Sequence, residues 1–275
     1  MTVREALRLG SGILDSAGVP DARLDAEYLM AGVLDVPRLL ALAAGDTQLT
    51  DRRTEEYLDL IGRRASREPL QYILGTQSFM GFIFRVRPLV LIPRQDTETL
   101  CEQALLWAPE GGSLLDLCTG SGALAIAIKK LREDLAVTAT DISGEALDLA
   151  RENALALDAE VRFLQGDLLA PVRGERFDVI VSNPPYIPTA DIPGLQAEVL
   201  KEPALALDGG PDGLAFYRRI TEKAKDALNA GGALLMEIGC SQAADVRALM
   251  NSAGFTGLQT VRDMAGLDRV VAGRL

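Results

Sequence analysis

After residue 112, short apolar segments alternate regularly with longer segments of helical periodicity, and this restricts the fold more than any other feature of the sequence. Seven apolar segments are expected to be strands: residues 114–118, 136–140, 161–165, 177–182, 233–237, 257–261 and 269–273. Four segments between them have apolar residues at helical spacing: residues 123–131, 144–155, 214–229 and 241–253. Repeated strand–helix units of this kind indicate an α/β protein with a doubly wound, mostly parallel, seven-stranded sheet and helices on both faces.

The residues before this region predict a separate, smaller domain. Short stretches with apolar residues at helical spacing, interrupted by glycine and proline, predict a helical domain over residues 1–78. Alternating apolar residues predict a β-hairpin linker over residues 79–92, with Pro88 in its turn. The α/β domain then occupies residues 93–275.

Composition excludes several classes of function. The 275 residues include no histidine, which removes His-dependent catalytic triads and His-ligated metals, and only three cysteines, without a CxxC pair. We therefore expect no metal. The net charge of −11 disfavours non-specific binding to nucleic acid. No apolar run is long enough for a membrane span, and the chain starts without a signal peptide, so we expect a cytoplasmic protein that does not bind membranes.

A glycine-rich turn follows the first strand of the α/β domain. It reads Asp116-Leu117-Cys118-Thr119-Gly120-Ser121-Gly122 and leads into the next expected helix. Glycines at such a point let the backbone approach a ligand and present amides at a helix N-terminus. The three-glycine dinucleotide fingerprint is incomplete, because Ala125 stands where its last glycine would be. The turn alone therefore predicts a nucleotide site only weakly.

Two acidic residues strengthen this prediction. Asp141 ends the second expected strand, 19 residues after Gly122, where a carboxylate can accept both hydroxyl protons of an adenosine ribose. The alternative role for Asp141 is to cap the next helix. Asp167, in Gly166-Asp167-Leu168, follows the third strand and could accept the amine of adenine, with Leu168 packed on the base. NAD, FAD and S-adenosylmethionine all remain possible ligands of such a site.

The most specific motif is Asn183-Pro184-Pro185-Tyr186, directly after the strand at residues 177–182. Consecutive prolines hold the backbone extended and remove two amide donors. The Asn183 side-chain oxygen and the Pro184 carbonyl remain as a rigid pair of acceptors, and Tyr186 adds an aromatic face. Such a pair suits a planar –NH2 group, which has two hydrogens to donate. A stiff connection without function is the alternative.

These motifs, in this order, resemble class I S-adenosylmethionine-dependent N-methyltransferases, and the fuller pattern resembles the release factor glutamine methyltransferase (PrmC/HemK) family. The resemblance covers nearly the whole chain, including Ile92-Pro93-Arg94-Gln95-Asp96-Thr97-Glu98 and the stretch from Glu202 to Leu214. It implies that the last two strands form an antiparallel hairpin at the edge of the sheet. Cys118 departs from the family pattern, where many relatives have glycine.

The resemblance implies methylation of the glutamine amide nitrogen (N5) in the Gly-Gly-Gln motif of bacterial class 1 peptide release factors. Asn183, Pro184 and Tyr186 are the expected catalytic residues. Substrate contacts are expected from these three with Pro185, Glu198 and Glu202. The donor S-adenosyl-L-methionine is expected to contact Asp116, Cys118, Thr119, Gly120, Ser121, Gly122, Asp141, Ile142, Asp167, Leu168 and Asn183. The expected partner is a release factor, with no direct contact to DNA and a monomeric enzyme.

Two other functions stay open at this point. A DNA adenine-N6 methyltransferase shares the Asn-Pro-Pro-Tyr motif, but it should have a basic face and a recognition insertion, and the chain has neither in evident form. A non-catalytic interaction protein that retains the fold should have degraded motifs, whereas those of this chain are intact.

Overall fold

The computed structural model describes all residues from Met1 to Leu275, and they separate into two compact units. The helical unit comprises Met1–Gly75 together with Gln196–Lys201. The sheet unit comprises Thr76–Leu195 and Glu202–Leu275. Each unit has its own hydrophobic core. None of the helices is long and apolar enough to cross a membrane.

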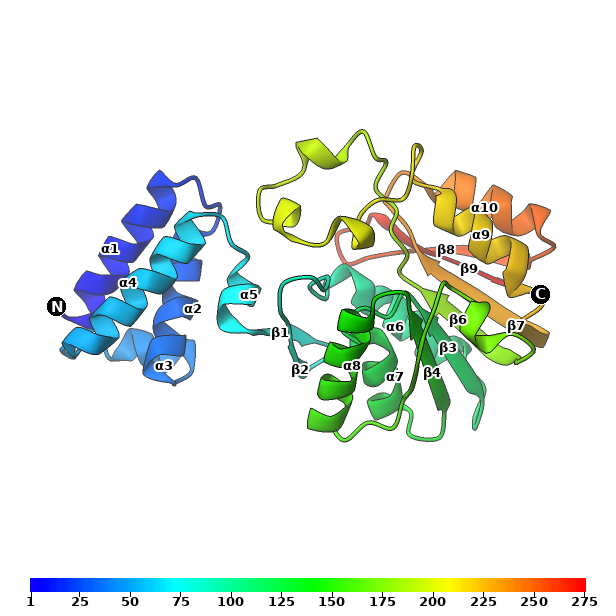
Figure 1. Cartoon of the computed structure of the whole chain (residues 1–275), viewed down its shortest axis with the longest axis horizontal. Helices are drawn as coiled ribbons and strands as arrows, with labels where there is room; N and C mark the ends of the chain where they lie inside the picture. The colour runs from blue at the N-terminus through cyan, green and yellow to red at the C-terminus, as the bar shows by residue number, and fades with distance from the viewer. The chain divides into compact units, whose positions relative to one another are not determined.

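The helical unit is built from five helices (Figure 1). They are α1 (Val3–Ser16), α2 (Ala22–Leu34), α3 (Arg38–Ala43), α4 (Asp51–Ala65) and α5 (Leu70–Leu74). Thr2 begins α1 with a capping box, in which its hydroxyl accepts from the Glu5 amide and the Glu5 carboxylate accepts from the Thr2 amide. Gly10 lets α1 lie close to α4, because a Cβ at this position would come within 2.3 Å of the Tyr57 hydroxyl.

A short segment far along the chain, Gln196–Lys201, completes the helical unit. Its Glu198 carboxylate accepts hydrogen bonds from Arg67 Nε and Nη2, each at 2.7 Å, and forms an ion pair with Arg64 at 2.8 Å. Arg64 is buried and also pairs with Asp25 of α2, at 2.7 Å. These ion pairs therefore attach the segment to α2 and α4.

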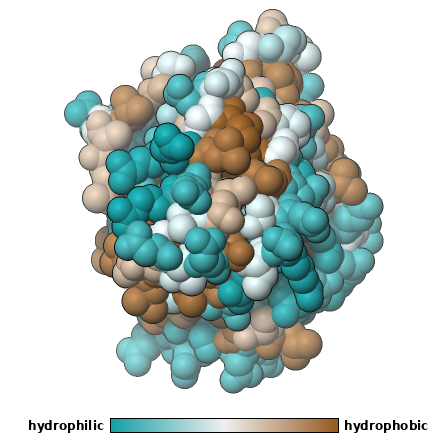
Figure 2. Space-filling model, turned by 90° about the vertical axis from the view of Figure 1, so that its left-hand side faces the viewer, coloured by the Kyte–Doolittle hydropathy of each residue, from teal (hydrophilic) through white to brown (hydrophobic).

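Several large apolar side chains of the helical unit are exposed, among them Leu9 and Ile13 on α1 and Leu39 and Leu40 on α3. Figure 2 shows apolar patches among the hydrophilic side chains on this side of the molecule.

The sheet unit begins with a two-stranded antiparallel hairpin, β1 (Thr76–Phe79) and β2 (Phe82–Arg85). The expected position of this hairpin was wrong. Its turn is at Met80 and Gly81, whose φ angles of 50° and 80° suit a tight two-residue turn, and no strand follows Pro88.

The main sheet has seven strands in the order β5-β4-β3-β6-β7-β9-β8. The strands are β3 (Ser113–Leu117), β4 (Ala136–Asp141), β5 (Arg162–Gln165), β6 (Phe177–Ser182), β7 (Leu228–Glu237), β8 (Thr256–Arg262) and β9 (Asp268–Arg274). The first five of these pair in parallel, and β9 pairs antiparallel with both β7 and β8. The expected fold class is confirmed, including the terminal hairpin.

Helices cover both faces of this sheet (Figure 1). They are α6 (Asp96–Trp107), α7 (Ala123–Leu131), α8 (Gly144–Ala156), α9 (Ala215–Ala224) and α10 (Ala243–Ser252), with short 3-10 turns at Ala170–Val172, Ile192–Gly194, Val199–Lys201 and Ala204–Ala206. Neighbouring strand residues face opposite layers: Leu114 packs with α6 and α7, whereas Leu115 packs with α9 and α10. The helix expected to reach residue 229 ends at Ala224, because β7 begins at Leu228.

Candidate functional site

A cavity of about 380 Å³ opens where the strands β3, β4 and β6 end. In parallel α/β sheets this edge is where ligands bind. The lining comes wholly from the sheet unit: it includes Asp116, Cys118, Thr119, Gly120, Ser121, Asp141, Ile142, Asp167, Leu168, Asn183 and Pro185, together with Thr97, Leu205, Phe216 and Arg219. The structure therefore brings almost all of the expected donor-binding residues to one cavity.

The glycine-rich turn owes its shape to three residues with positive φ: Cys118 (61°), Gly120 (56°) and Gly122 (79°). Gly122 does not line the cavity. Its role is packing, because a Cβ there would come within 2.9 Å of Ala150 on α8. Cys118 adopts the left-handed conformation despite its side chain, although this conformation favours glycine.

Asp116 is buried at the start of the turn, and its carboxylate accepts a hydrogen bond from Thr119 Oγ1 at 2.6 Å. Burial above all, together with the charge of Asp141, raises the pKa of Asp116 to about 7, and the Thr119 hydrogen bond opposes the shift. No arginine or lysine pairs with this carboxyl. It is consequently an acid whose charge responds to a cation entering the cavity.

Asp141, at the end of β4, holds the turn in place. Its carboxylate accepts from the Gly120 amide at 2.8 Å and the Ser143 amide at 2.9 Å. The N-cap of α8 is Ser143, whose hydroxyl accepts from Ala146, so Asp141 does not cap this helix itself. Burial raises the pKa of Asp141, and the backbone hydrogen bonds oppose the shift. Each of its oxygens keeps acceptor capacity toward the cavity.

The lining of the cavity also includes apolar side chains and one ion pair. Ile142, Leu168, Leu205 and Phe216 are apolar lining residues, of a kind that packs well on a planar base. Asp167 is half-exposed and its carboxylate pairs with Arg219 of α9. Sequence reasoning missed Phe216 and Arg219. The segment from Glu202 to Leu214, which carries the family resemblance, ends just before them and is the signal that could have found them.

Asn183 lies directly after β6 and lines the cavity. Its amide nitrogen donates to Thr97 Oγ1 at 3.1 Å, and its Oδ1 accepts no hydrogen bond within the chain. The carbonyl of Pro184 likewise accepts none. Asn183 therefore has a free acceptor oxygen, while one of its two N–H donors is engaged by Thr97. Thr97 had been noted only as part of the stretch beginning at Ile92, with no role assigned.

Of the other three residues of this motif, all expected to contact the substrate, only one lines the cavity. Pro185 lines the cavity, but Pro184 and Tyr186 do not. The Tyr186 ring packs against the apolar layer under α9 and α10, and burial raises its pKa to about 12. The Tyr186 carbonyl accepts from Gln242 Nε2 at 2.9 Å. The ring thus anchors the motif from behind.

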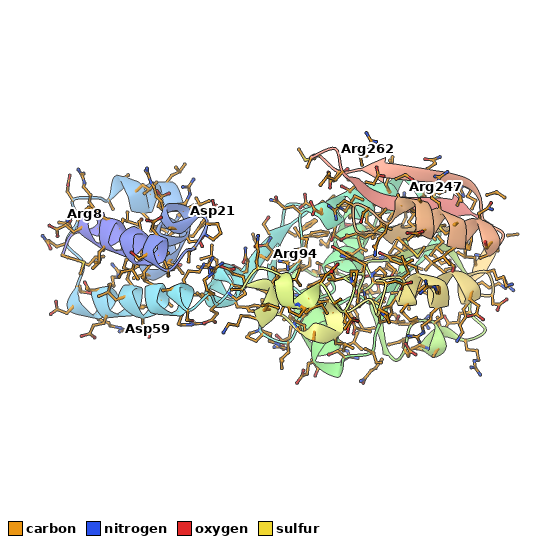
Figure 3. The ribbon with its side chains drawn as sticks, turned by 90° about the horizontal axis from the view of Figure 1, so that it is seen from above. Arg8, Asp21, Asp59, Arg94, Arg247 and Arg262 are labelled. Carbon is orange, nitrogen blue, oxygen red and sulfur yellow. The ribbon has the colours of Figure 1, made fainter.

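The two glutamates expected at the substrate have structural partners instead. Glu198 pairs with Arg64 and Arg67 inside the helical unit and does not line the cavity. Glu202 is buried, pairs with Arg94 (labelled in Figure 3) and accepts from the Ile92 amide at 3.0 Å. Because both carboxylates are engaged by arginines, their assignment to substrate contact is corrected. The spacing of residues along the chain does not indicate either pairing.

The lining suits a nucleoside that carries a positive charge. Asp141 offers acceptors for ribose hydroxyls, the apolar wall offers a surface for adenine, and Asp116 with Asp141 gives the cavity a negative character. Its volume is within the usual range for a small-molecule site. These properties fit S-adenosylmethionine, whose sulfonium is cationic.

Known proteins resemble this chain over its full length. Residues 5–75 match the family described as PrmC N-terminal domain, and residues 96–210 match the family described as Methyltransferase small domain. The release factor glutamine methyltransferase of Geobacter sulfurreducens is 45% identical over 100% of this chain and 97% of its own length. That of Moorella thermoacetica is also 45% identical, over 98% and 97%.

Solved structures share the fold. A methyltransferase from Pyrococcus furiosus aligns with a TM-score of 0.58 and 20% identity, over 78% of this chain and 98% of its own. The 16S rRNA methyltransferase of T. thermophilus, solved with AdoMet and guanosine, aligns with a TM-score of 0.53 and 18% identity, over 72% and 49%. With the intact cavity and the full-length relatives together, the chain belongs to the release factor glutamine methyltransferase family and is an S-adenosylmethionine-dependent methyltransferase.

Proposed function

We propose that the protein methylates the side-chain amide nitrogen (N5) of the glutamine in the Gly-Gly-Gln motif of bacterial class 1 peptide release factors. The observation that carries this proposal is the state of Asn183. Asn183 lines the cavity, its amide nitrogen donates to Thr97, and its Oδ1 accepts no hydrogen bond within the chain. A carboxamide –NH2 needs such acceptors, and the relatives of this chain are named for a glutamine substrate.

Asn183 Oδ1 and the Pro184 carbonyl are proposed to accept the two N–H bonds of the glutamine amide. Pro184 immediately precedes the cavity-lining Pro185, and its carbonyl accepts no hydrogen bond within the chain. Holding both hydrogens orients the nitrogen and favours its departure from planarity, which frees a lone pair that is otherwise delocalised into the carbonyl. Alignment of this kind can lower a barrier by about 7 to 11 kcal/mol.

S-adenosylmethionine supplies an electrophilic methyl group when bound. The nitrogen–carbon bond forms as the carbon–sulfur bond breaks, and the methylated amide then releases one N–H proton to solvent. Asp116 and Asp141 favour the cationic donor over its neutral product, and the apolar wall at Leu168 and Phe216 holds the base. The mechanism requires no histidine and no metal, in keeping with the composition.

The helical unit is proposed to dock the release factor. It exposes large apolar side chains on α1 and α3, including Leu39 at 71% and Leu40 at 58% exposure. Such side chains are typical of a protein-binding surface. The net charge of −11 favours a partner with basic groups over DNA. We propose that a single copy of the chain suffices for this activity, because every lining residue of the cavity comes from one sheet unit.

The decisive experiment is Asn183→Ala, assayed by mass spectrometry of a purified release factor incubated with the donor. We expect turnover to fall about a hundredfold or more, in line with the loss of a positioned contact to the reacting group. Donor affinity, measured by calorimetry, should change little, because the donor's ribose and base are held by other lining residues.

Asn251→Ala is the matched control, since Asn251 is exposed on α10 and does not line the cavity. It should retain wild-type turnover. Methylation of duplex DNA in place of the release factor would favour the adenine-methyltransferase alternative. Full turnover by Asn183→Ala would remove Asn183 from the mechanism.

A further inference from the structure

The Asn183–Tyr186 motif, which carries the proposed acceptors, is held by hydrogen bonds at both of its ends. Directly before it, the Ser182 hydroxyl donates to a carbonyl of β3 at 3.0 Å. At its far end, the Tyr186 carbonyl accepts from Gln242 Nε2 at 2.9 Å. Between these two points the prolines restrict the backbone, so a movement at one end is passed along the motif. The placement of the acceptors therefore depends on both ends.

Gln242 is a buried residue at the N-cap of α10, 9% exposed, and both ends of its amide have matching partners. Its Nε2 donates to the Tyr186 carbonyl and, at 3.4 Å, to the Gly213 carbonyl. Its Oε1 accepts from the Gly239 amide at 2.9 Å. A glutamate of the same shape has no protons for the two carbonyls, and a methionine can make none of these bonds. The position therefore makes use of what is specific to an amide.

Two glycines let a second segment of the chain lie against the same end of the motif. A Cβ at Gly213 would come within 2.4 Å of the Tyr186 carbonyl oxygen and 2.7 Å of Gln242 Nε2. A Cβ at Gly209 would come within 2.7 Å of the Tyr186 Cα. The Gly209 amide also donates to the Ile187 carbonyl at 2.8 Å. The end of the motif is therefore enclosed by close backbone packing as well as by Gln242.

This junction lies outside the cavity, although the segment that forms it also reaches the cavity. Leu205 and Phe216, which flank the two glycines in the sequence, line the cavity. Gly209, Gly213 and Gln242 do not. An effect of these three residues on the reaction must therefore pass through the motif that they hold.

We propose that Gln242 is a positioning residue for methyl transfer, which holds the Tyr186 carbonyl and thereby keeps the acceptors of Asn183 and Pro184 in place for the substrate amide. The inference rests on the proposed function, because it concerns the same carboxamide. Gln242 contacts no reacting atom. Its contribution is alignment, and a misplacement of about 1 Å in an active site can lower the rate about a hundredfold.

The test is a double-mutant cycle between Gln242→Met and Asn183→Ala, measuring kcat for methyl transfer to a purified class 1 release factor. Methionine keeps the length of the side chain and removes its hydrogen bonds. We expect Gln242→Met alone to lower kcat roughly 10- to 100-fold. In the Asn183→Ala background it should lower kcat by no more than about threefold, because the acceptor side chain that it positions is already absent.

A second variant, Gly213→Ala, reaches the same hydrogen bond from another segment. Its methyl group would meet both the Tyr186 carbonyl and Gln242 Nε2, so kcat should fall, and the loss should not multiply with that of Gln242→Met. Gly174→Ala is the matched control, because Gly174 also has a positive φ, 87° against 73°, but has open space where a Cβ would be. Gln259→Met, on the exposed face of β8, is the control for glutamine. Both controls should retain the wild-type kcat.

Two further measurements separate positioning from a general loss of structure. The kcat of each variant is measured well below its own unfolding temperature, so that all of the protein is folded. The affinity for S-adenosylmethionine, measured by calorimetry, should stay within about twofold in Gln242→Met, because Gln242 does not line the cavity.

Wild-type kcat in Gln242→Met, or a loss that multiplies with that of Asn183→Ala, would overturn this inference alone. A loss of donor affinity as large as the loss of kcat would do the same, because the substitution would then have changed the whole cavity. Absence of transfer by the wild-type protein, or full turnover by Asn183→Ala, would overturn the proposed function and this inference together.

Discussion

The helical unit and the cavity of the sheet unit hold carboxylates in different ways. In the helical unit, Glu198 is held by Arg64 and Arg67, and the Arg67 hydrogen bond above all lowers its pKa to about 2. At the cavity and directly behind it, Asp116 and Glu237 form no ion pair, and burial raises the pKa of each to about 7. Glu198 is thus kept charged by its arginines, whereas Asp116 and Glu237 are left ready to titrate.

This difference separates carboxylates that hold the fold together from carboxylates that are available for ligand binding. A carboxylate fixed by arginine holds two segments together, as Glu198 holds Gln196–Lys201 to the helices. A carboxylate without a cation lies in or directly behind the cavity, where a cationic donor and a planar amide are proposed to bind. Perturbed acids at a cavity are candidates for function, whereas neutralised acids elsewhere are candidates for structure.

The largest effect is expected from removing the arginine of the helical unit. Arg64→Met should destabilise the protein by about 3 to 5 kcal/mol, because it leaves the buried carboxylate of Asp25 without its arginine and takes one of two arginines from Glu198. Denaturant unfolding followed by the circular dichroism of the helices measures it. Affinity for the donor should not change, since Arg64 does not line the cavity.

Arg63→Met is the matched control on the same helix. Arg63 pairs with Glu68 and is 40% exposed, so its loss should cost less than about 1 kcal/mol. Equal destabilisation by the two variants would contradict the contrast between buried and solvated pairs.

The second effect concerns the unpaired acid of the cavity. Because the pKa of Asp116 in the free protein is about 7, the cationic donor must bind in competition with a proton at lower pH. Affinity for S-adenosylmethionine should therefore fall as the pH drops through 7, by about tenfold between pH 8 and pH 6. Calorimetry at the two pH values measures the change.

Two comparisons check its cause. S-adenosylhomocysteine lacks the sulfonium charge, so its affinity should depend less on pH. Asp116→Asn should weaken the donor at pH 8 and remove most of the pH dependence. A wild-type pH dependence that survives in Asp116→Asn would assign the titration to another group.

Much of the fold could be predicted from the sequence, because its pattern is local. Each of the seven strands of the main sheet is present close to its expected place, since alternation of apolar segments with helices depends on near neighbours in the chain. The hairpin was misplaced because Pro88 is a stronger turn signal than Met80-Gly81. Both places form turns, with a positive φ at Leu89 as well as at Met80 and Gly81, but only Met80-Gly81 joins two paired strands.

The residues of the site also fall into those that the sequence could predict and those that it could not. Asp116, Asp141 and Asn183 could be found because each ends a strand at the edge where ligands bind. Glu198 and Glu202 were misassigned, and Thr97 had no assigned role, because their partners lie more than 80 residues away in the chain. Motifs locate groups along one strand edge, but they do not tell which acid meets an arginine.

The smallest effect is expected from an ion pair that is exposed to solvent. Arg151 and Asp148 form an ion pair of 2.9 Å on α8, with side chains 50% and 68% exposed. Arg151→Met removes an arginine from a carboxylate, as Arg64→Met does, but here water can solvate the charge that is left. We expect a change of less than about 0.5 kcal/mol in the free energy of unfolding. A loss comparable with that of Arg64→Met would mean that pairing itself, and not burial, decides what an arginine contributes in this protein.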